Sequence, residues 1–237
     1  MSTKTPTIGL IVPPAAGLVP SDGQRLYAGR AHFIARGLGL DEVSPSGFKK
    51  VVEHIMDRAM ELRDAGASTI SLMGTSLSFY RGAAFTDDLR AAMQEATGVP
   101  CTTMSHAIVR AMRALGIRRV AVATSYIDEL NNRLQDFLGS HEIEVTALRG
   151  LSILGVDAVG KVPESTLIEL SEAVYRDDPS ADGLFISCGG LITLDILAPL
   201  EAKLDIPATS SSPAGFWDVM KVAGLDSSAE GFGRMFA

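Results

Sequence analysis

Two cysteines, Cys101 and Cys188, are the residues of this sequence whose chemistry most needs an explanation. In an expected reducing compartment a disulfide between them is improbable, so each thiol is interpreted on its own. A lone cysteine among small residues is ordinarily a buried apolar filler. A thiol near its reference pKa of roughly 8.5 can instead carry a proton at neutral pH and give it to a substrate anion, whose charge raises that pKa further. A nucleophilic cysteine needs the opposite, a low pKa.

Neutral hydroxyl donors form a second group. Thr75 and Ser76 follow one apolar run, and Tyr126 follows another. Such donors, together with free backbone amides, can form an oxyanion site, in which one donor can change a rate by on the order of 100-fold. The alternative is that Thr75 and Ser76 cap the next helix and that Tyr126 is a core tyrosine. Capping and oxyanion binding can coexist.

Other polar residues give weaker signals. His106 follows a strand end and could face a cleft, although a neutral imidazole beside Ser105 is more often a local hydrogen-bonding partner. The remaining histidines have no carboxylate or cysteine at ligand spacing, so no metal site is predicted: His32, His54 and His141. Neither GxGxxG nor a P-loop motif follows any strand, which removes the usual sequence basis for a dinucleotide or ATP site. Asp22 and Arg25 either contact solvent or order the first loop.

The elements that must position these residues alternate between strands and helices. Short apolar runs that end in small or polar residues are typical of buried parallel strands, and they occur at Ile8–Val12, Thr69–Met73, Val99–Thr103, Val120–Thr124, Leu184–Ser187 and Ile206–Thr209. Helical apolar spacing occurs at Phe48–Ala65, Asp87–Thr97, Tyr126–Leu138 and Pro163–Tyr175. This alternation predicts an α/β fold with mainly parallel sheets flanked by helices.

An internal repeat relates the two halves of the chain. Three pairs of segments match at a shift of about 110 residues: 7–13 with 119–125, 71–76 with 185–190, and 99–105 with 206–212, where a helix follows each member. The repeat predicts two similar lobes, 1–118 and 119–237, related by pseudo-two-fold symmetry, with late segments that can cross between them. Cys188 matches Gly74 in this repeat. Cys101 matches Ala208, which favours a packing role for Cys101.

The strand ends predict where a ligand binds. In open α/β sheets ligands bind beyond the carboxyl ends of the strands. The loops at 13–18, 74–76, 125–126, 188–190 and 210–213 are therefore expected to converge on one cleft between the lobes. Pro13 and Pro14 form either a rigid exit from the first strand or an apolar wall of that cleft.

Composition limits the partners. A chain of 237 residues with 46% hydrophobic content can bury a sizeable core. Its net charge of -7 and lack of Lys/Arg clusters argue against nucleic acid or an anionic membrane as partner and favour a small molecule. No window approaches a membrane span of about 18 apolar residues, and the apolar stretch in MSTKTPTIGLIVPP is too short for a signal sequence. A cytoplasmic location is expected.

Four motifs carry a resemblance to a known family. GLIVPPAAG at 9–17, MGTSLSFYRG at 73–82, SCGGL at 187–191 and SSSPAGFW at 210–217 closely resemble the arylmalonate decarboxylases of the aspartate/glutamate racemase superfamily. The likeness covers nearly the whole chain. It implies a carboxy-lyase that converts α-aryl-α-alkyl malonates to (R)-2-arylpropionates with neither a metal nor an organic cofactor.

The resemblance also implies roles at the matching positions. Cys188 would be the proton donor. Thr75, Ser76 and Tyr126, with the backbone amides after Gly74 and in the Gly189-Gly190 loop, would hold the retained carboxylate and the enediolate. Leu40, Val43 and Val156 would line the apolar pocket for the departing carboxylate. Phe48 and Val159 depart from the family pattern, where a tyrosine and a larger methionine are expected, and so bear on substrate preference.

Gly74 separates this chain from other members of the superfamily. In the two-cysteine racemases each lobe places a thiol at the same point of its repeat, one to remove a proton and one to deliver it. With Gly74 in the first lobe, two-base inversion has no base, whereas loss of CO2 makes a carbanion without proton abstraction. Among the alternatives, a racemase or maleate-type cis-trans isomerase is the nearer one, and Gly74 argues against it because those chemistries employ two thiols. A non-catalytic two-lobed binding protein is the farther one, because it predicts neither the thiol nor so many hydroxyls at the cleft.

Overall fold

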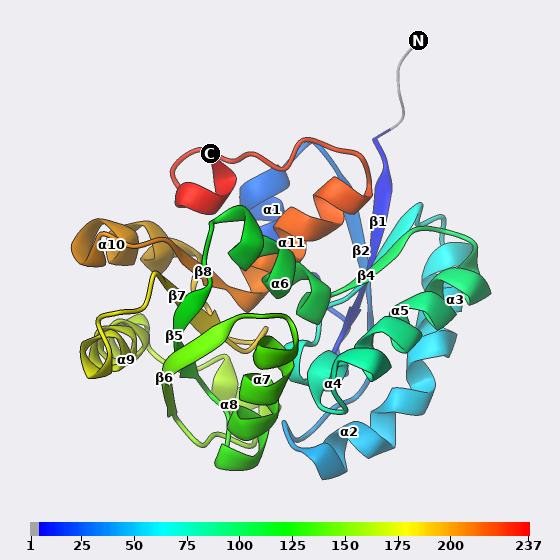
Figure 1. Cartoon of the computed structure of the whole chain (residues 1–237). Helices are drawn as coiled ribbons and strands as arrows, with labels where there is room; N and C mark the ends of the chain where they lie inside the picture. Colours follow the sequence, from blue (N-terminus) through cyan, green and yellow to red (C-terminus); the bar gives the residue numbers. More distant parts are fainter. Residues whose placement is uncertain (1–4) are drawn as a thin grey trace.

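Two four-stranded parallel sheets flanked by helices make up the fold in the computed structural model, which describes residues 5–237 (Figure 1). The first sheet has the strand order β2-β1-β3-β4 and the second has β6-β5-β7-β8, so the same order occurs twice. The predicted α/β architecture with two similar sheets is therefore confirmed. The sheets use residues from 7–103 and from 119–210, and the lobe boundary at 118/119 stays a prediction.

Six strands coincide with the six predicted apolar runs. The eight strands of the described chain are β1 Thr7–Val12, β2 His32–Gly37, β3 Thr69–Leu72, β4 Cys101–Thr103, β5 Arg119–Thr124, β6 Glu144–Gly150, β7 Gly183–Ser187 and β8 Ala208–Ser210. β1, β3, β5 and β7 are almost entirely buried, as strands covered on both faces must be. β2 and β6, on one edge of each sheet, do not match a predicted run, because they are only partly buried and carry charged residues. β4 and β8, on the opposite edges, are buried.

Helices connect the strands and cover the sheets. They are α1 Ser21–Tyr27, α2 Pro45–Val51, α3 Ile55–Asp64, α4 Thr75–Phe79, α5 Ala83–Thr97, α6 Met104–Ala114, α7 Asp128–Ser140, α8 Val156–Val159, α9 Glu164–Asp177, α10 Leu194–Leu204 and α11 Ser211–Val222, with 3-10 turns at Val52–His54 and Arg234–Phe236.

The single helix predicted at Phe48–Ala65 is instead two helices, α2 and α3, joined by the turn at Val52–His54. α2 begins earlier than predicted because Ser44 accepts a hydrogen bond from the Gly47 amide and Pro45 occupies the first helical position. The helix predicted from Tyr126 begins at Asp128, so Tyr126 lies in the preceding loop.

The last long helix, α11, packs between the two sheets. It contacts α6, α1, β3 and β4 as well as β7 and β8, and Figure 1 shows α6 and α11 in the middle of the molecule. Phe216 packs edge-to-face on Phe33 of β2, with ring centroids 5.2 Å apart. Asp218 is buried, accepts a 2.6 Å hydrogen bond from Thr102 of β4 and forms a 3.0 Å ion pair with Arg110 of α6. α11 therefore fixes the two halves of the chain to each other.

Candidate active site

A cavity of about 270 Å³ opens where the carboxyl ends of the two sheets meet. Its wall includes Pro13, Pro14 and Leu18 after β1, the segment 74–77 after β3, the segment 188–192 after β7, and Ser212 at the start of α11. The predicted convergence of these loops on one cleft is confirmed. The loop at 125–126 is the exception, since neither of its residues forms part of the wall.

Cys188 is the thiol of this cavity. It is the first residue after β7 and has a φ of 143°, a conformation that side chains other than glycine rarely adopt. Its amide donates a 3.3 Å hydrogen bond to Ser211 Oγ, and its carbonyl accepts one of 3.2 Å from the Leu191 amide. Burial raises the pKa of the thiol, and the Ser125 hydroxyl, the Gly190 amide and the Tyr126 hydroxyl offset part of that rise. A raised pKa keeps a thiol protonated at neutral pH, which suits a proton donor better than a nucleophile.

Gly74 lies on the wall of the same cavity, directly before α4. Its φ of -135° is ordinary extended backbone, so this position does not require glycine for its conformation. A Cβ added there would meet Leu77 Cβ at 3.3 Å and Pro13 Cγ at 3.4 Å, which is tight but is not a contact with backbone. A small side chain at this position would enter the cavity.

The hydroxyl donors divide into two layers. Thr75 and Ser76 line the cavity, whereas Tyr126 is fully buried and does not. The Tyr126 ring packs on Phe79, and its hydroxyl accepts a 3.2 Å hydrogen bond from Ser187 and interacts with the hydroxyls of Thr75 and Ser76. Burial raises the pKa of Tyr126 well above its usual value, and the neighbouring Cys188 adds to that rise. Tyr126 is thus a neutral donor placed behind the two cavity-lining hydroxyls.

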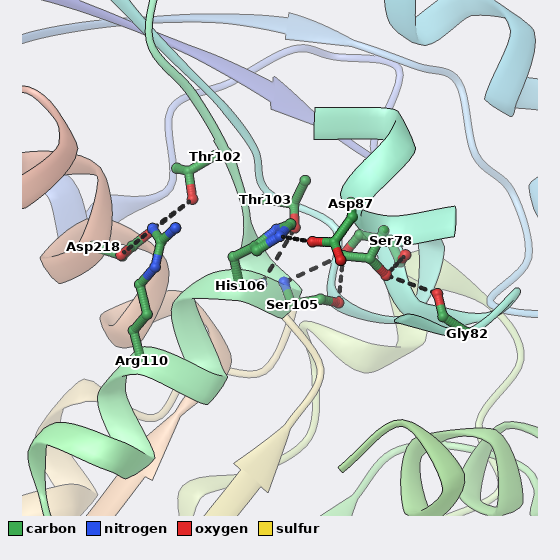
Figure 2. A network of polar contacts seen from close by, with 10 residues as sticks. Ser78, Gly82, Asp87, Thr102, Thr103, Ser105, His106, Arg110 and Asp218 are labelled. Carbon is green, nitrogen blue, oxygen red and sulfur yellow. Dashed lines mark hydrogen bonds and ion pairs between the residues drawn. The ribbon is translucent and has the colours of Figure 1, made fainter. Parts of the chain in front are cut away.

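A buried network that the sequence did not reveal holds the loop at 74–76. Ser78 Oγ lies 2.9 Å from the carbonyl oxygens of both Gly74 and Thr75, and 2.6 Å from Ser105 Oγ. Ser105 Oγ in turn donates a 3.0 Å hydrogen bond to the Thr75 carbonyl. Figure 2 shows Ser105 in contact with Ser78. These contacts fix the direction of the backbone at the cavity wall. The only hint in the sequence is the density of hydroxyl residues after β3.

His106 belongs to the outer part of this network and is not among the residues of the cavity wall. Its ring nitrogens lie 2.9 Å from Thr103 Oγ1 and 2.9 Å from Asp87 Oδ1, as Figure 2 shows. Desolvation lowers the pKa of His106 despite the carboxylate beside it. His106 is therefore a local hydrogen-bonding partner at the start of α6.

One side of the cavity is apolar. Leu40, Val43, Phe48, Val156 and Val159 line it, and Pro13 and Pro14 extend it. The Val43 amide donates a 2.7 Å hydrogen bond to the Leu154 carbonyl, and the Val156 amide donates one of 3.1 Å to the Asp41 carbonyl. Backbone contacts therefore join the two halves of the chain at this wall. Phe48 and Val159, where the resemblance predicts departures from the family pattern, both contribute to this wall.

Asp22 is a wall residue whose role the sequence does not decide. Its carboxyl is buried and accepts a 2.6 Å hydrogen bond from Ser212 Oγ. Desolvation raises the pKa of Asp22, although Ser212 and Arg25 oppose this rise. Arg25 forms two hydrogen bonds with Asp195 of α10, at 2.8 and 2.6 Å. Asp22 and Arg25 thus tie α1 to α11 and α10, which orders the loop at 13–20.

Metal clusters and membrane helices are both missing from residues 5–237. No group of three or more His, Cys, Asp or Glu side chains in this part of the chain is arranged to hold a metal ion. Within the same residues, no helix has the length and apolar character needed to cross a membrane.

Comparisons with known proteins identify enzymes that this chain resembles over nearly its whole length. A curated arylmalonate decarboxylase from Bordetella bronchiseptica is 54% identical over 234 residues, which cover 98% of this chain and 97% of that protein. A crystal structure of an arylmalonate decarboxylase mutant in the liganded form has a TM-score of 0.96 at 53% identity, covering 98% of this chain and 99% of that chain.

More distant proteins share the fold. The maleate cis-trans isomerase of Nocardia farcinica, in a structure bound to TRIS, has a TM-score of 0.90 at 21% identity and covers 98% of this chain and 97% of that chain.

The sequence model of the family described as arylmalonate decarboxylase matches residues 8–236. By this match and by its similarity to the Bordetella bronchiseptica enzyme, the chain belongs to the arylmalonate decarboxylase family.

Proposed function

We propose that this enzyme decarboxylates α-aryl-α-alkyl malonates to (R)-2-arylpropionates without a cofactor, and that Cys188 delivers the proton to the product. The observation that carries this proposal is the pairing of Cys188 with Gly74 on the wall of one cavity. One buried, protonated thiol faces the substrate, and the equivalent position of the repeat has no side chain.

Two chemically different regions of the wall would receive the two carboxylates of the substrate. Thr75, Ser76 and the amides of Gly189 and Gly190 would bind the retained carboxylate, with the Tyr126 hydroxyl behind them. Leu40, Val43 and Val156 would surround the departing carboxylate. An apolar surrounding disfavours a charged carboxylate but not neutral CO2, so it promotes the loss of CO2.

Cleavage of the carbon–carbon bond leaves its electron pair on the α-carbon and the retained carboxylate, as an enediolate. The hydroxyl and amide donors would stabilise the charge that develops there. The Cys188 S–H bond then breaks, its proton forms the new C–H bond, and the electron pair stays on sulfur as a thiolate. Because a single donor faces the planar intermediate, protonation on one face yields one enantiomer.

The proposal is tested by incubating the purified protein with phenylmalonate and with methylphenylmalonate. Release of CO2 and formation of (R)-2-phenylpropionate, resolved by chiral chromatography, are the expected results. The same preparation should leave maleate and enantiopure 2-phenylpropionate unchanged. Turnover of maleate to fumarate, or racemisation of the propionate, without CO2 release would instead identify an isomerase or racemase. Tight binding of the malonate without any turnover would identify a binding protein.

A further inference from the structure

Ser125 is the neighbour of Cys188 across two paired strands. β5 and β7 pair in parallel, with Thr124 opposite Ser187 as the last partners of the ladder. The next residue of each strand is Ser125 on one side and Cys188 on the other. The Ser125 amide continues the pairing with a 3.3 Å hydrogen bond to the Ser187 carbonyl. The two side chains therefore leave the sheet from adjacent points of its carboxyl edge.

The Ser125 hydroxyl is fully buried and unpartnered. Among residues 5–237 its Oγ has no hydrogen-bond partner. Two nearby hydroxyls, by contrast, do have hydrogen-bond partners: Thr124 Oγ1 donates to Asn131 at 2.7 Å, and Ser187 Oγ donates to Tyr126 at 3.2 Å. A buried hydroxyl without a partner destabilises a fold, so its presence here needs an explanation.

The ionised form of Cys188 supplies a partner for this hydroxyl. Three donors stabilise a thiolate at this position: the Ser125 hydroxyl, the Gly190 amide and the Tyr126 hydroxyl. The other titratable groups around the thiol are the Tyr126 phenol and the Asp22 carboxyl, which lines the same cavity. Of the two side-chain donors in this set, the Tyr126 hydroxyl already has a partner in Ser187, whereas Ser125 Oγ has none among residues 5–237.

The internal repeat shows the same relationship without the thiol. Pro13 follows β1 as Ser125 follows β5, and Pro13 lies beside Gly74, with its Cγ 3.4 Å from the position of a Cβ there. Where the repeat carries a thiol, its neighbour is a hydroxyl donor. Where the repeat lacks a thiol, the neighbour is a proline whose side chain cannot donate a hydrogen bond.

We propose that Ser125 is a positioning residue of the protonation step, whose hydroxyl donates a hydrogen bond to the Cys188 thiolate as the thiol gives its proton to the substrate carbanion. This inference rests on the proposed function. The electron pair of the broken S–H bond stays on sulfur, and the Ser125 O–H remains intact and turns toward it. A solvent proton then restores the thiol. Stabilising the thiolate as it forms lowers the barrier to proton transfer, which is the behaviour of a donor aimed at developing charge.

The test compares Ser125→Ala with Ser171→Ala. Ser171 is the matched control, because its hydroxyl is also fully buried and unpartnered within the described chain but lies on α9, away from the cavity wall. Both variants should fold, with melting temperatures at or above that of the parent, since each loses an unsatisfied hydroxyl. Iodoacetamide alkylation of Cys188 is then followed against pH by peptide mass spectrometry, which separates it from Cys101.

Ser125→Ala should move the alkylation midpoint of Cys188 upward by about one pH unit, because a hydrogen bond to a charged group is lost. The rate of phenylmalonate decarboxylation should fall by roughly tenfold. The alkaline limb of its pH–rate profile should move to higher pH together with the alkylation midpoint. Ser171→Ala should change neither property. Ser125→Thr, which keeps the hydroxyl, should restore the midpoint of the parent.

Three outcomes would overturn the inference. An unchanged midpoint in Ser125→Ala would mean that the hydroxyl does not bond the thiolate. An equal shift in Ser171→Ala would mean that the effect comes from packing. A shifted midpoint with an unchanged rate would remove Ser125 from the protonation step. Alkylation of Cys188 does not depend on turnover, so its pH midpoint tests the contact between Ser125 and the thiolate even in an inactive protein. A parent protein that releases no CO2 would overturn the proposed function but not this contact.

Discussion

Ser212 Oγ donates a 2.6 Å hydrogen bond to Asp22 Oδ2, which joins α11 to α1 at the cavity wall. Burial raises the pKa of Asp22 above 3.8, its value in the unfolded chain. At a pH between the unfolded and the folded pKa of Asp22, the folded state binds more protons than the unfolded state. The stability that Asp22 contributes is therefore present below about pH 4 and is lost as pH rises through its folded pKa.

Asp22→Asn should remove the loss of folding stability at rising pH, because the amide cannot ionise and still offers an oxygen to Ser212. We expect the variant to melt near the parent temperature at about pH 3 and above it at about pH 8, as thermal denaturation across this range would record. Asp195→Asn is a control of opposite sign. The pKa of Asp195 is lowered by its bond to Arg25, so its stabilising effect is present above about pH 4 and is lost on acidification. A parallel response of both variants would contradict the prediction.

Replacing Cys188 by alanine should lower turnover by on the order of 1,000-fold and leave folding intact, because a methyl group fills the site but carries no acidic proton. Cys188→Ser should retain a trace of activity, since a hydroxyl is a far weaker acid than a thiol. The measurement is CO2 release under single-turnover and steady-state conditions, with circular dichroism to confirm the fold. Cys101→Ala is the matched thiol control, because Cys101 is buried in β4 outside the cavity wall and should tolerate the change with full activity. A rate near that of the parent in Cys188→Ala would exclude the assigned donor.

A thiol added at Gly74 should face the substrate from the other side. The ordinary φ at this position and its limited contacts with Leu77 and Pro13 mean that Gly74→Cys should fold with a modest loss of rate. With thiols on both sides, this variant should racemise enantiopure 2-arylpropionate. Gly74→Cys combined with Cys188→Ser should still decarboxylate a prochiral arylmalonate and deliver the proton to the opposite face. Chiral chromatography of that product is the decisive measurement, and an unchanged configuration would mean that the two positions do not flank the intermediate.

The decarboxylation should be independent of metal ions. Exhaustive dialysis against EDTA is expected to leave the rate with phenylmalonate unchanged, because hydroxyl and amide donors supply the stabilisation that a Lewis acid would otherwise provide. The parent dialysed without chelator is the control. Loss of activity that a single divalent ion restores would refute the proposed chemistry.

The sequence predicts the buried strands of this fold better than the partly exposed ones. β1, β3, β5 and β7 are buried on both faces, and continuous apolar runs record that burial. β2 and β6 are only partly buried, so their sequences lack such a run, whereas the other two edge strands, β4 and β8, are buried and were predicted. The repeat adds what periodicity cannot, because it assigns Gly74 and Cys188 to equivalent points of the two sheets.

Contacts between distant segments are what the sequence could not supply. The hydrogen bond between Ser78 and Ser105 joins residues 27 positions apart, and the bond of Asp22 to Ser212 joins residues 190 positions apart. The Tyr126 ring packs on Phe79, a contact that no local pattern encodes. Its role toward the substrate stays a prediction.

The position of α11 imposes an order on the assembly of this protein during synthesis. A ribosome releases the strands of the first sheet early, yet β3, β4 and Phe33 receive their cover only when Phe216 and Asp218 emerge, more than a hundred residues later. Until then the nascent chain carries an exposed apolar face, the kind of surface that chaperones bind and that promotes aggregation. The helix that completes the first sheet also begins with Ser211 and Ser212, the partners of Cys188 and Asp22. The cavity and the cover of the first sheet are therefore completed in the same event, and a polypeptide that stalls before α11 emerges has neither.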